Sequence, residues 1–379
     1  MQTKLHPYLS RLDHLRFYAA SLVVMFHFFH TKQGDLRQGN PLISLIDEGH
    51  SGIALFMVIS GFIFTVIAGN QQVHYGGFLR NRILRIYPLF VFAVFLQLLF
   101  STYNDQRNYG FIQLIGWLVP FRSDTVPLSP YFVQLWTIWV EFQFYLIFPF
   151  LLTFSRRFGA RYLWGLLGLL LLVRALIFAA SGSVRFLAYE TIFGRLDQFI
   201  IGMLVARIYI WQADITCIAS KTATQHQPTG NPLWLLLAAL AVLLGLHAFS
   251  WRVGYSELAS PFWIVWPPIE AAMWAAFLWA YLHTRWPGPL ALRRRVDAKL
   301  AALGSISFST YVMHNLVIAA VNAQLPLLPV PGGPLAQTLT TGALVVLPAT
   351  LAVATVTYWL IERPFLAMRS QYTSPTPPK

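Results

Sequence analysis

The chain alternates between long apolar stretches and short polar segments. Ten of the apolar stretches come close to the roughly 20 residues that a helix needs to cross a bilayer. The alternating segments of a membrane β-barrel are not found in the sequence. We therefore predict an all-α polytopic membrane protein, a bundle of about ten transmembrane helices. The predicted helices cover residues 12–30, 50–68, 86–101, 134–154, 163–180, 194–211, 233–250, 262–283, 303–323 and 339–360.

The positions of the basic residues predict the orientation of this bundle. Most of the 27 Lys and Arg residues fall in segments that share a side with the N-terminus, and cytoplasmic loops carry an excess of such residues. Both termini are therefore predicted to be cytoplasmic. We expect one transmembrane domain over residues 1–370 and a disordered, Pro-rich cytoplasmic tail over 371–379. A shorter apolar run at 111–119 is predicted to be re-entrant or interfacial.

Composition supports the membrane class and excludes others. The chain is 56% hydrophobic and 11% charged, with a mean hydropathy of +0.57, whereas a soluble domain is about 25% charged. The net charge of +13 comes from residues between apolar runs, so it indicates topology and no nucleic-acid partner is expected. A single cysteine excludes an intramolecular disulfide and a cysteine metal cluster.

Arg16 and His27 are the first polar residues that need an explanation. Both lie in the first apolar stretch, and the eleven positions between them amount to about three helical turns, or roughly 16 Å along the axis. They therefore share one face of the predicted helix. Ionisable groups inside a membrane usually face a bundle interior or a water-filled cavity. The alternative is that His27 is a packed histidine and Arg16 an interfacial anchor.

Two further segments combine charge with apolar surroundings. Arg82 and Arg85 share a helix face at a membrane mouth, where guanidinium forks suit phosphate groups, although positive-inside anchoring would explain them as well. Glu141 lies in an apolar stretch, and Tyr145 faces the same way four residues on. Trp136 precedes both of them. A buried carboxylate needs a cation, a donor or a proton, and a packing salt bridge is the alternative to a catalytic role.

Polar residues also enter the sixth and ninth predicted helices. Arg195 and Asp197 are two residues apart and do not share a helix face, so we expect each to meet a partner on another helix. His314 follows Tyr311 by three residues and Ser307 by seven, which predicts a polar stripe along one face.

The chemistry that these residues predict is acyl transfer. No HExxH motif or carboxylate cluster supports a metal site, and the glycine-rich nucleotide motifs and GxSxG are absent from the sequence. What remains is His27 as a general base, a carboxylate to orient it, and arginines for a phosphorylated donor. A histidine can accept the proton of a hydroxyl that attacks a thioester.

Seven short segments in this order resemble the membrane-bound acyltransferase 3 family of O-acyltransferases. They spread over residues 12–364, essentially the whole chain. Some relatives carry an additional SGNH hydrolase-like domain, and this chain resembles the stand-alone branch without it. The segments are LDHLRFYAASLVVMFH, GIALFMVISGF, RNRILRIYP, LWTIWVEFQFYLIFP, GRLDQFIIGML, SISFSTYVMHN and ERP.

The resemblance implies transfer of an acyl group, with acetyl-CoA as the expected donor, to a hydroxyl of a cell-surface glycan or lipid-linked sugar. It implies location in the bacterial inner (plasma) membrane, contact with lipids and no metal, and it leaves a homodimer open. His27 is the expected catalytic residue. The other assigned residues are Glu141 and Asp197 as catalytic helpers, Arg16, Arg82 and Arg85 for the donor, and Trp136, Tyr145 and His314 for the substrate.

Two other functions are compatible with buried charges. A proton-coupled secondary transporter of a small metabolite or lipid-linked glycan also uses intramembrane Arg, His, Asp and Glu. Such transporters show two pseudo-symmetric halves with broken helices at matching places, and no such symmetry is evident in this sequence. A structural subunit of a polysaccharide assembly complex would leave the buried ionisable groups without a role.

Overall fold

The computed structural model describes residues 8–34, 40–104, 111–118, 131–220, 230–255 and 257–375, with the side chains of 101–104, 111–114 and 213–220 excepted. The N-terminal end of the predicted domain and the last residues of the predicted tail lie outside these ranges, as do parts of the longer loops.

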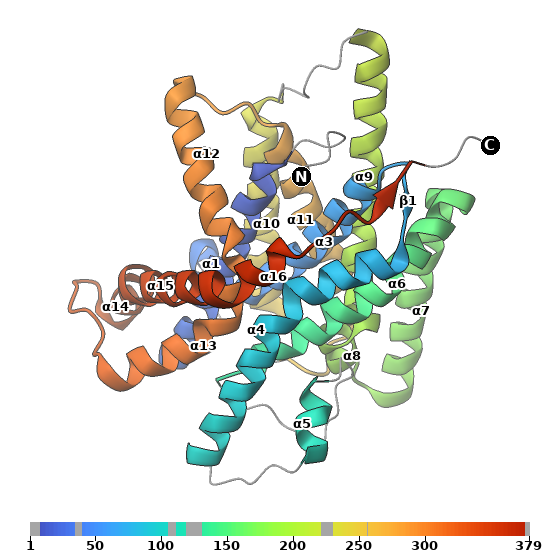
Figure 1. Cartoon of the computed structure of the whole chain (residues 1–379). Coiled ribbons are helices and arrows are strands. Elements are labelled where there is room, and N and C mark those ends of the chain that lie inside the picture. The colour runs from blue at the N-terminus through green and yellow to red at the C-terminus, as the bar shows by residue number, and fades with distance from the viewer. Residues whose placement is uncertain are drawn as a thin grey trace.

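The described chain is almost entirely helical (Figure 1). Single helical turns of the 3-10 type precede α3, α6 and α11. The helices are α1 (Ser10–Gln33), α2 (Pro41–Asp47), α3 (Gly52–Ala68), α4 (Tyr75–Asn104), α5 (Phe111–Leu118), α6 (Trp136–Phe158), α7 (Ala160–Ser181), α8 (Arg185–Glu190), α9 (Ile192–Ser220), α10 (Pro232–Arg252), α11 (Trp266–His283), α12 (Leu290–Ser305), α13 (Ser307–Gln324), α14 (Gly333–Thr341), α15 (Leu347–Thr357) and α16 (Arg363–Ala367).

Each of the ten predicted segments falls largely on helical residues, but several limits differ, and two segments illustrate the difference. Helix α4 begins at Tyr75, eleven residues before the predicted start, and it tolerates Pro88 in its interior. The predicted segment 303–323 runs across a break at Ile306, where the axis bends by 61° between α12 and α13. Apolar pattern alone does not reveal such a bend, because apolar and small residues continue across Ile306 from the last turn of α12 into α13.

Six described helices are long and apolar enough to cross a membrane, or seven if α12 and α13 count as one broken span. The six are α3 with its preceding turn, α4, α6, α7, α10, and the run from α14 to α16. These helices confirm the all-α, multi-pass membrane class. The number ten and the side on which the termini lie stay predictions.

Helices α3 and α9 pack face to face through two glycines. A Cβ on Gly61 would lie 2.0 Å from the carbonyl oxygen of Phe199, and one on Gly202 would lie 2.1 Å from that of Val58. No side chain fits at either position. The small residues of α3 therefore serve close helix approach, as membrane bundles often require, and this seam forms the centre of the buried core.

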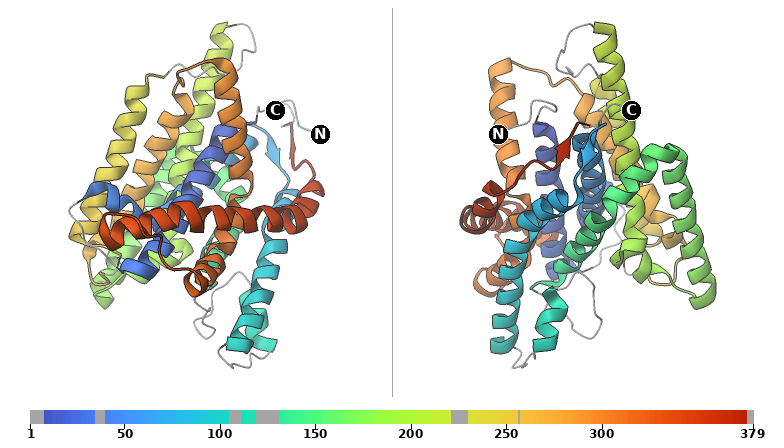
Figure 2. Two further views of the ribbon diagram at one scale, coloured as in Figure 1. Left: turned by 90° about the vertical axis from the view of Figure 1, so that its left-hand side faces the viewer. Right: turned by 45° about the vertical axis from the view of Figure 1, so that its right-hand side comes forward.

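The C-terminal third of the chain runs across the rest of the bundle. In Figure 2 the run from α14 to α16 crosses the helices behind it instead of lying parallel to them. Two π-helical turns, Gly342–Val346 and Tyr358–Glu362, interrupt this run. Helix α13 packs against both this run and α1, so residues of α13 reach the bundle interior.

The chain returns at its end to the start of α4. Strand β1 (Gln72–Val73) pairs antiparallel with strand β2 (Thr373–Ser374), so that Gln72 lies opposite Ser374. The tail predicted from residue 371 thus begins with an ordered strand pair. This pair and the first turn of α1 lie toward the same end of the molecule in both views of Figure 2.

Candidate active site

His27 and His314 meet in the bundle interior. His27 comes from α1 and His314 from α13, and the Nε2 atom of His314 lies 3.1 Å from the Nδ1 atom of His27. The Nδ1 atom of His27 is also 3.0 Å from the carbonyl oxygen of Val23, and that of His314 is 2.5 Å from the carbonyl oxygen of Tyr311. His314 is fully buried, whereas His27 is partly exposed. The structure thus brings together the predicted catalytic and substrate-binding histidines.

These contacts assign the protons on the two rings. A carbonyl oxygen can only accept, so the Nδ1 atom of each ring carries a hydrogen. The Nε2 atom of His314 must then be the acceptor that faces the N–H of His27. This arrangement leaves the Nε2 lone pair of His27 unprotonated in the neutral ring. No hydrogen bond to that atom is found among the described residues. A fixed imidazole with one free basic nitrogen is equipped to accept a proton.

Helix α13 is held in register by amide and hydroxyl contacts to the start of α6. Gln134 donates to the carbonyl oxygen of Val312 at 2.7 Å and accepts from Asn315 at 2.8 Å. The hydroxyl of Thr137 lies 2.8 Å from that of Tyr311. These bonds flank His314 along the helix and fix its position. Its neighbour in the sequence, Asn315, is therefore a supporting residue that the sequence analysis did not single out.

Glu141 forms a polar group with Tyr145 and Ser60 and not with His27. The Tyr145 hydroxyl donates to the Glu141 carboxylate, and the Ser60 hydroxyl donates to the same oxygen at 3.3 Å. The pairing of Glu141 with Tyr145 agrees with their spacing of four residues. Arg82 lies beside this group, with its guanidinium carbon 5.9 Å from the centre of the Tyr145 ring.

The Arg82 guanidinium lacks a hydrogen-bond or ion-pair partner among the described residues. It rests on the Phe64 ring at 4.7 Å, makes no ion pair or hydrogen bond within the described chain, and has a buried Nε–H without an acceptor. Arg85 differs, because it pairs with Glu362 at 3.0 Å. A guanidinium presents five N–H donors in a planar fork that matches phosphate oxygens. Arg82 is therefore available for an anionic ligand.

The arginine pair and the histidine pair are connected along α13. Glu362 binds Arg85 on one side and accepts a hydrogen bond from Ser309 on the other. Ser309 precedes His314 by five residues on α13, which corresponds to about 7.5 Å along the helix axis. One helix thus contacts both predicted parts of the site.

Arg16 occupies the opposite end of α1 from His27. The structure confirms that one helix carries both residues. Arg16 pairs with Asp13 at 2.7 Å and is about 30% exposed. Asp13 also accepts a hydrogen bond from Tyr8, and burial together with that bond raises the pKa of Tyr8. No contact of Arg16 with Arg82 or with His27 is found among the described residues.

Asp197 and Arg195 meet partners on separate helices, as their spacing predicts. Asp197 pairs with Arg174 of α7 at 2.7 Å, and both side chains are fully buried. Arg195 lies 3.4 Å from Glu270 of α11, and Gln198 donates to the same carboxylate at 2.9 Å. Neither acid contacts His27. Trp136 packs beside this second group, since the Arg195 guanidinium lies 5.8 Å from its ring centre.

Arg174 and Glu270 were not among the residues predicted from the sequence, although the signal for them is present. Both are charged residues inside apolar stretches, the same feature that singled out Glu141. Their pairing could not be inferred, because it depends on which helices are neighbours.

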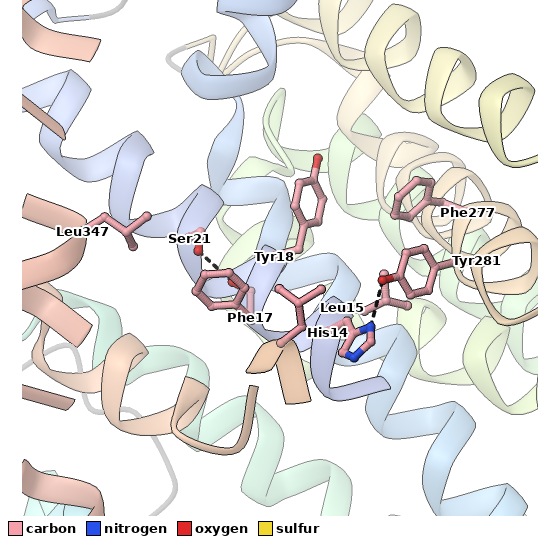
Figure 3. A pocket seen from close by; sticks show the side chains of 9 residues that line it. His14, Leu15, Phe17, Tyr18, Ser21, Phe277, Tyr281 and Leu347 are labelled. Atoms are coloured by element: carbon pink, nitrogen blue, oxygen red, sulfur yellow. Dashed lines mark hydrogen bonds between the residues drawn. The ribbon is translucent and has the colours of Figure 1, made fainter. Parts of the chain in front are cut away.

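A cavity of about 400 Å³ opens on the other face of α1 (Figure 3). Its lining is almost entirely apolar, with Tyr18 and Phe277 on facing helices. At one end His14 lies 3.0 Å from the hydroxyl of Tyr281. On the helical repeat these residues point away from the stripe that carries His27, so this cavity is separate from the histidine pair. Within the described residues, no group of three His, Cys, Asp or Glu side chains is placed to hold a metal ion.

Comparison with known proteins defines the class to which this site belongs. Residues 9–359 match the acyltransferase domain that defines the acyltransferase 3 family. The chain therefore belongs to this family, and it is a membrane acyltransferase. Among curated proteins it is similar to Nodulation protein 10 of Rhizobium leguminosarum bv. viciae, with 25% identity over 334 residues, 82% of this chain and 83% of the relative. No solved structure matches the chain.

Proposed function

We propose that this acyltransferase moves an acyl group, acetyl in the simplest case, from acyl-CoA to a hydroxyl of a cell-surface glycan or lipid-linked sugar. We place the protein in the bacterial inner membrane. The observation that carries the proposal is the histidine pair, in which His27 keeps a free basic nitrogen while His314 and a backbone carbonyl hold its other nitrogen.

In the proposed reaction His27 acts as the general base. Its Nε2 atom accepts the proton of the acceptor hydroxyl while the oxygen attacks the carbonyl carbon of the thioester. The tetrahedral intermediate then collapses, the C–S bond breaks, and the CoA thiolate takes the proton back from His27. His314 is a positioning residue, because it fixes the ring through the Nδ1–H of His27. No redox step or additional reactant is required.

We assign the phosphates of the donor to Arg82 and Arg85. This assignment is supported by the Arg82 guanidinium, which rests on Phe64 and has no hydrogen-bond or ion-pair partner among the described residues. Helix α13 contacts the Arg85–Glu362 pair through Ser309 and also carries His314, so one helix joins the proposed donor site to the proposed base. The donor role of Arg16 and the helper roles of Glu141 and Asp197 stay predictions. The assignment of Trp136 and Tyr145 to substrate binding also stays a prediction.

The test is a comparison of acylated surface glycans from cells that carry wild-type protein or His27→Ala. We expect acyl transfer to fall by about 10²- to 10⁴-fold, the usual contribution of a general base. Mass analysis of the glycans gives the readout. His283→Gln is the matched control, because the Nδ1 atom of His283 likewise contacts the carbonyl four residues earlier. Unchanged acylation in His27→Ala would remove His27 from the mechanism.

A further inference from the structure

The segment after α16 closes over the beginning of α4. We call residues 369–374 the C-terminal strap. Besides the pairing of β1 with β2, Asn81 exchanges two hydrogen bonds with the backbone of Ser370, at 2.5 and 3.1 Å. His74 contacts Ser374 at 2.8 Å. These bonds fix the strap against the turn of α4 that carries Arg82.

Two buried hydrogen-bond donors meet where the strap covers α4. The Tyr372 hydroxyl is buried without a partner in the described chain, and so is the Nε–H of Arg82. Both side chains pack on Phe78, at ring distances of 5.5 Å for Tyr372 and 5.7 Å for the Arg82 guanidinium. Leaving a buried donor unsatisfied costs about 1–3 kcal/mol. Two such donors around one aromatic ring indicate a missing acceptor.

The charge at this place has the sign that an acidic ligand requires. Partial desolvation lowers the pKa of Arg369, and the positive charges of Arg82 and Arg85 lower it further, so both lie within electrostatic range of the Arg369 guanidinium. Glu362 neutralises only Arg85. Neither Arg82 nor Arg369 has an acidic partner in the part of the chain that the structure describes. The side chain of Arg369 is exposed, which leaves its fork accessible to a ligand.

We propose that the C-terminal strap completes the phosphate-binding site of the donor, with Arg369 and the Tyr372 hydroxyl as donor-binding residues beside Arg82. Phosphate oxygens would accept from the N–H and O–H groups that the protein leaves unpaired, and their charge would offset the clustered guanidiniums. This inference rests on the proposed function, since it supposes that acyl-CoA is the donor. It adds two residues that contribute to binding and leave the histidine chemistry untouched.

The experiment measures CoA affinity by isothermal titration of the purified full-length protein in nanodiscs of neutral lipid. Tyr372→Phe removes one hydroxyl and keeps the ring, and Arg369→Gln removes one charge. We expect each to weaken CoA binding about three- to tenfold, in line with one lost hydrogen bond or ion contact. Binding of pantetheine, which has no diphosphate, should not change between these variants and wild type.

The controls separate a ligand contact from a structural one. Arg363→Gln removes a charge from the same end of the chain, where Arg363 stacks on Trp359 at 3.7 Å, and should bind CoA like wild type. Arg369→Lys keeps the charge without the planar fork and should fall between wild type and Arg369→Gln. Thermal unfolding without ligand checks that each variant is folded.

Three outcomes would overturn the inference, and they differ in whether the proposed function is also lost. CoA binding that Arg82→Ala abolishes but Tyr372→Phe and Arg369→Gln leave unchanged would reduce the strap to a structural element while the proposed function stands. In a parallel set of nanodiscs that contain phosphatidylglycerol, loss of bound phosphatidylglycerol from the variants at unchanged CoA affinity would assign these residues to a lipid headgroup. Absence of CoA binding to the wild-type protein would remove the donor and the proposed function together.

Discussion

Single residues in the bundle interior differ in whether the protein itself satisfies their charge and hydrogen-bonding capacity. The ion pair of Arg174 with Asp197 joins two fully buried charges on neighbouring helices. The Arg82 guanidinium and the Nε2 atom of His27 have no hydrogen-bond or ion-pair partner within the described residues. Groups of the first kind hold helices together, and groups of the second kind are the ones to which a ligand or substrate adds a bond.

The first prediction concerns the buried ion pair. Arg174→Ala leaves the carboxylate of Asp197 buried without its cation, and we expect a loss of about 3–5 kcal/mol in the free energy of unfolding. Thermal unfolding in detergent measures the effect. Arg161→Ala is the control, because Arg161 is exposed and bonds only to the carbonyl oxygen of Phe158.

A double variant sharpens this prediction. Removing both charges, as in Arg174→Ala with Asp197→Ala, should cost less than twice the single loss, because neither buried charge then remains uncompensated. Strictly additive losses would show that the two side chains do not act as a pair.

The second prediction concerns the positioning role of His314. His314→Gln replaces the ring that accepts from the Nδ1–H of His27, and we expect kcat to fall about tenfold, equivalent to roughly 1.4 kcal/mol. KM for the acyl donor should stay within twofold, because His314 does not contact the proposed phosphate site. Steady-state kinetics of the purified variant provide both constants. An increase in KM at constant kcat would instead assign His314 to substrate binding.

At the scale of elements, close helix approach decides where the polar groups meet. The seam between α3 and α9 leaves no room for a Cβ at Gly61. Helix α13 contacts both α1 and the turn that precedes α6, and it thereby fixes His314 beside His27. The positions of these helices, more than the local sequence around each polar residue, assemble the site.

The third prediction tests that seam. Gly61→Ala places a Cβ within 2.0 Å of the Phe199 carbonyl oxygen, and backbone cannot give way cheaply. We expect a loss of about 1–3 kcal/mol in stability, the usual cost of overpacking. Gly165→Ala on α7 is the matched control, because no atom lies within 4 Å of its added Cβ. Equal thermal stability of the two variants would contradict the tight seam.

Much of the helical content could be predicted from apolar pattern, and the limits of the elements could not. The predicted helix began at residue 86, yet α4 starts at Tyr75 and continues through Pro88, because a proline inside a membrane helix is tolerated when its neighbours compensate. The bend at Ile306 was invisible for a similar reason, since it interrupts no apolar run.

For the polar residues of the interior, spacing could predict neighbours within one helix but not pairings between helices. Spacing correctly joined Glu141 to Tyr145, because a separation of four residues fixes neighbours on one helix. It gave no information on contacts between helices. The meeting of His27 with His314, and that of Arg85 with Glu362, required the tertiary arrangement.

At the scale of the whole molecule, the distribution of charge predicts which side faces the cytoplasm. Helix α12 carries three consecutive arginines at 293–295, and its polar end lies toward the same end of the molecule as the strap in Figure 1. The positive-inside rule then assigns that end to the cytoplasm. The loop before α11, which contains Leu258, would face outward.

The fourth prediction tests this orientation by labelling. In a Cys217→Ser background, Leu258→Cys should react with a membrane-impermeant maleimide in intact cells, since Leu258 is exposed. Ala291→Cys, exposed on α12, should react only after the cells are opened. Labelling of both positions from outside, or the reverse order, would contradict a cytoplasmic location of the arginine-rich end.

The distance of 287 residues between His27 and His314 along the chain has a consequence for biosynthesis. Helix α1 leaves the ribosome early, and α13 follows only after most other helices have entered the bilayer. Until then the imidazole of α1 lacks the neighbour that orients it. An unfinished polypeptide therefore cannot form the pair of His27 with His314 before α13 has been inserted.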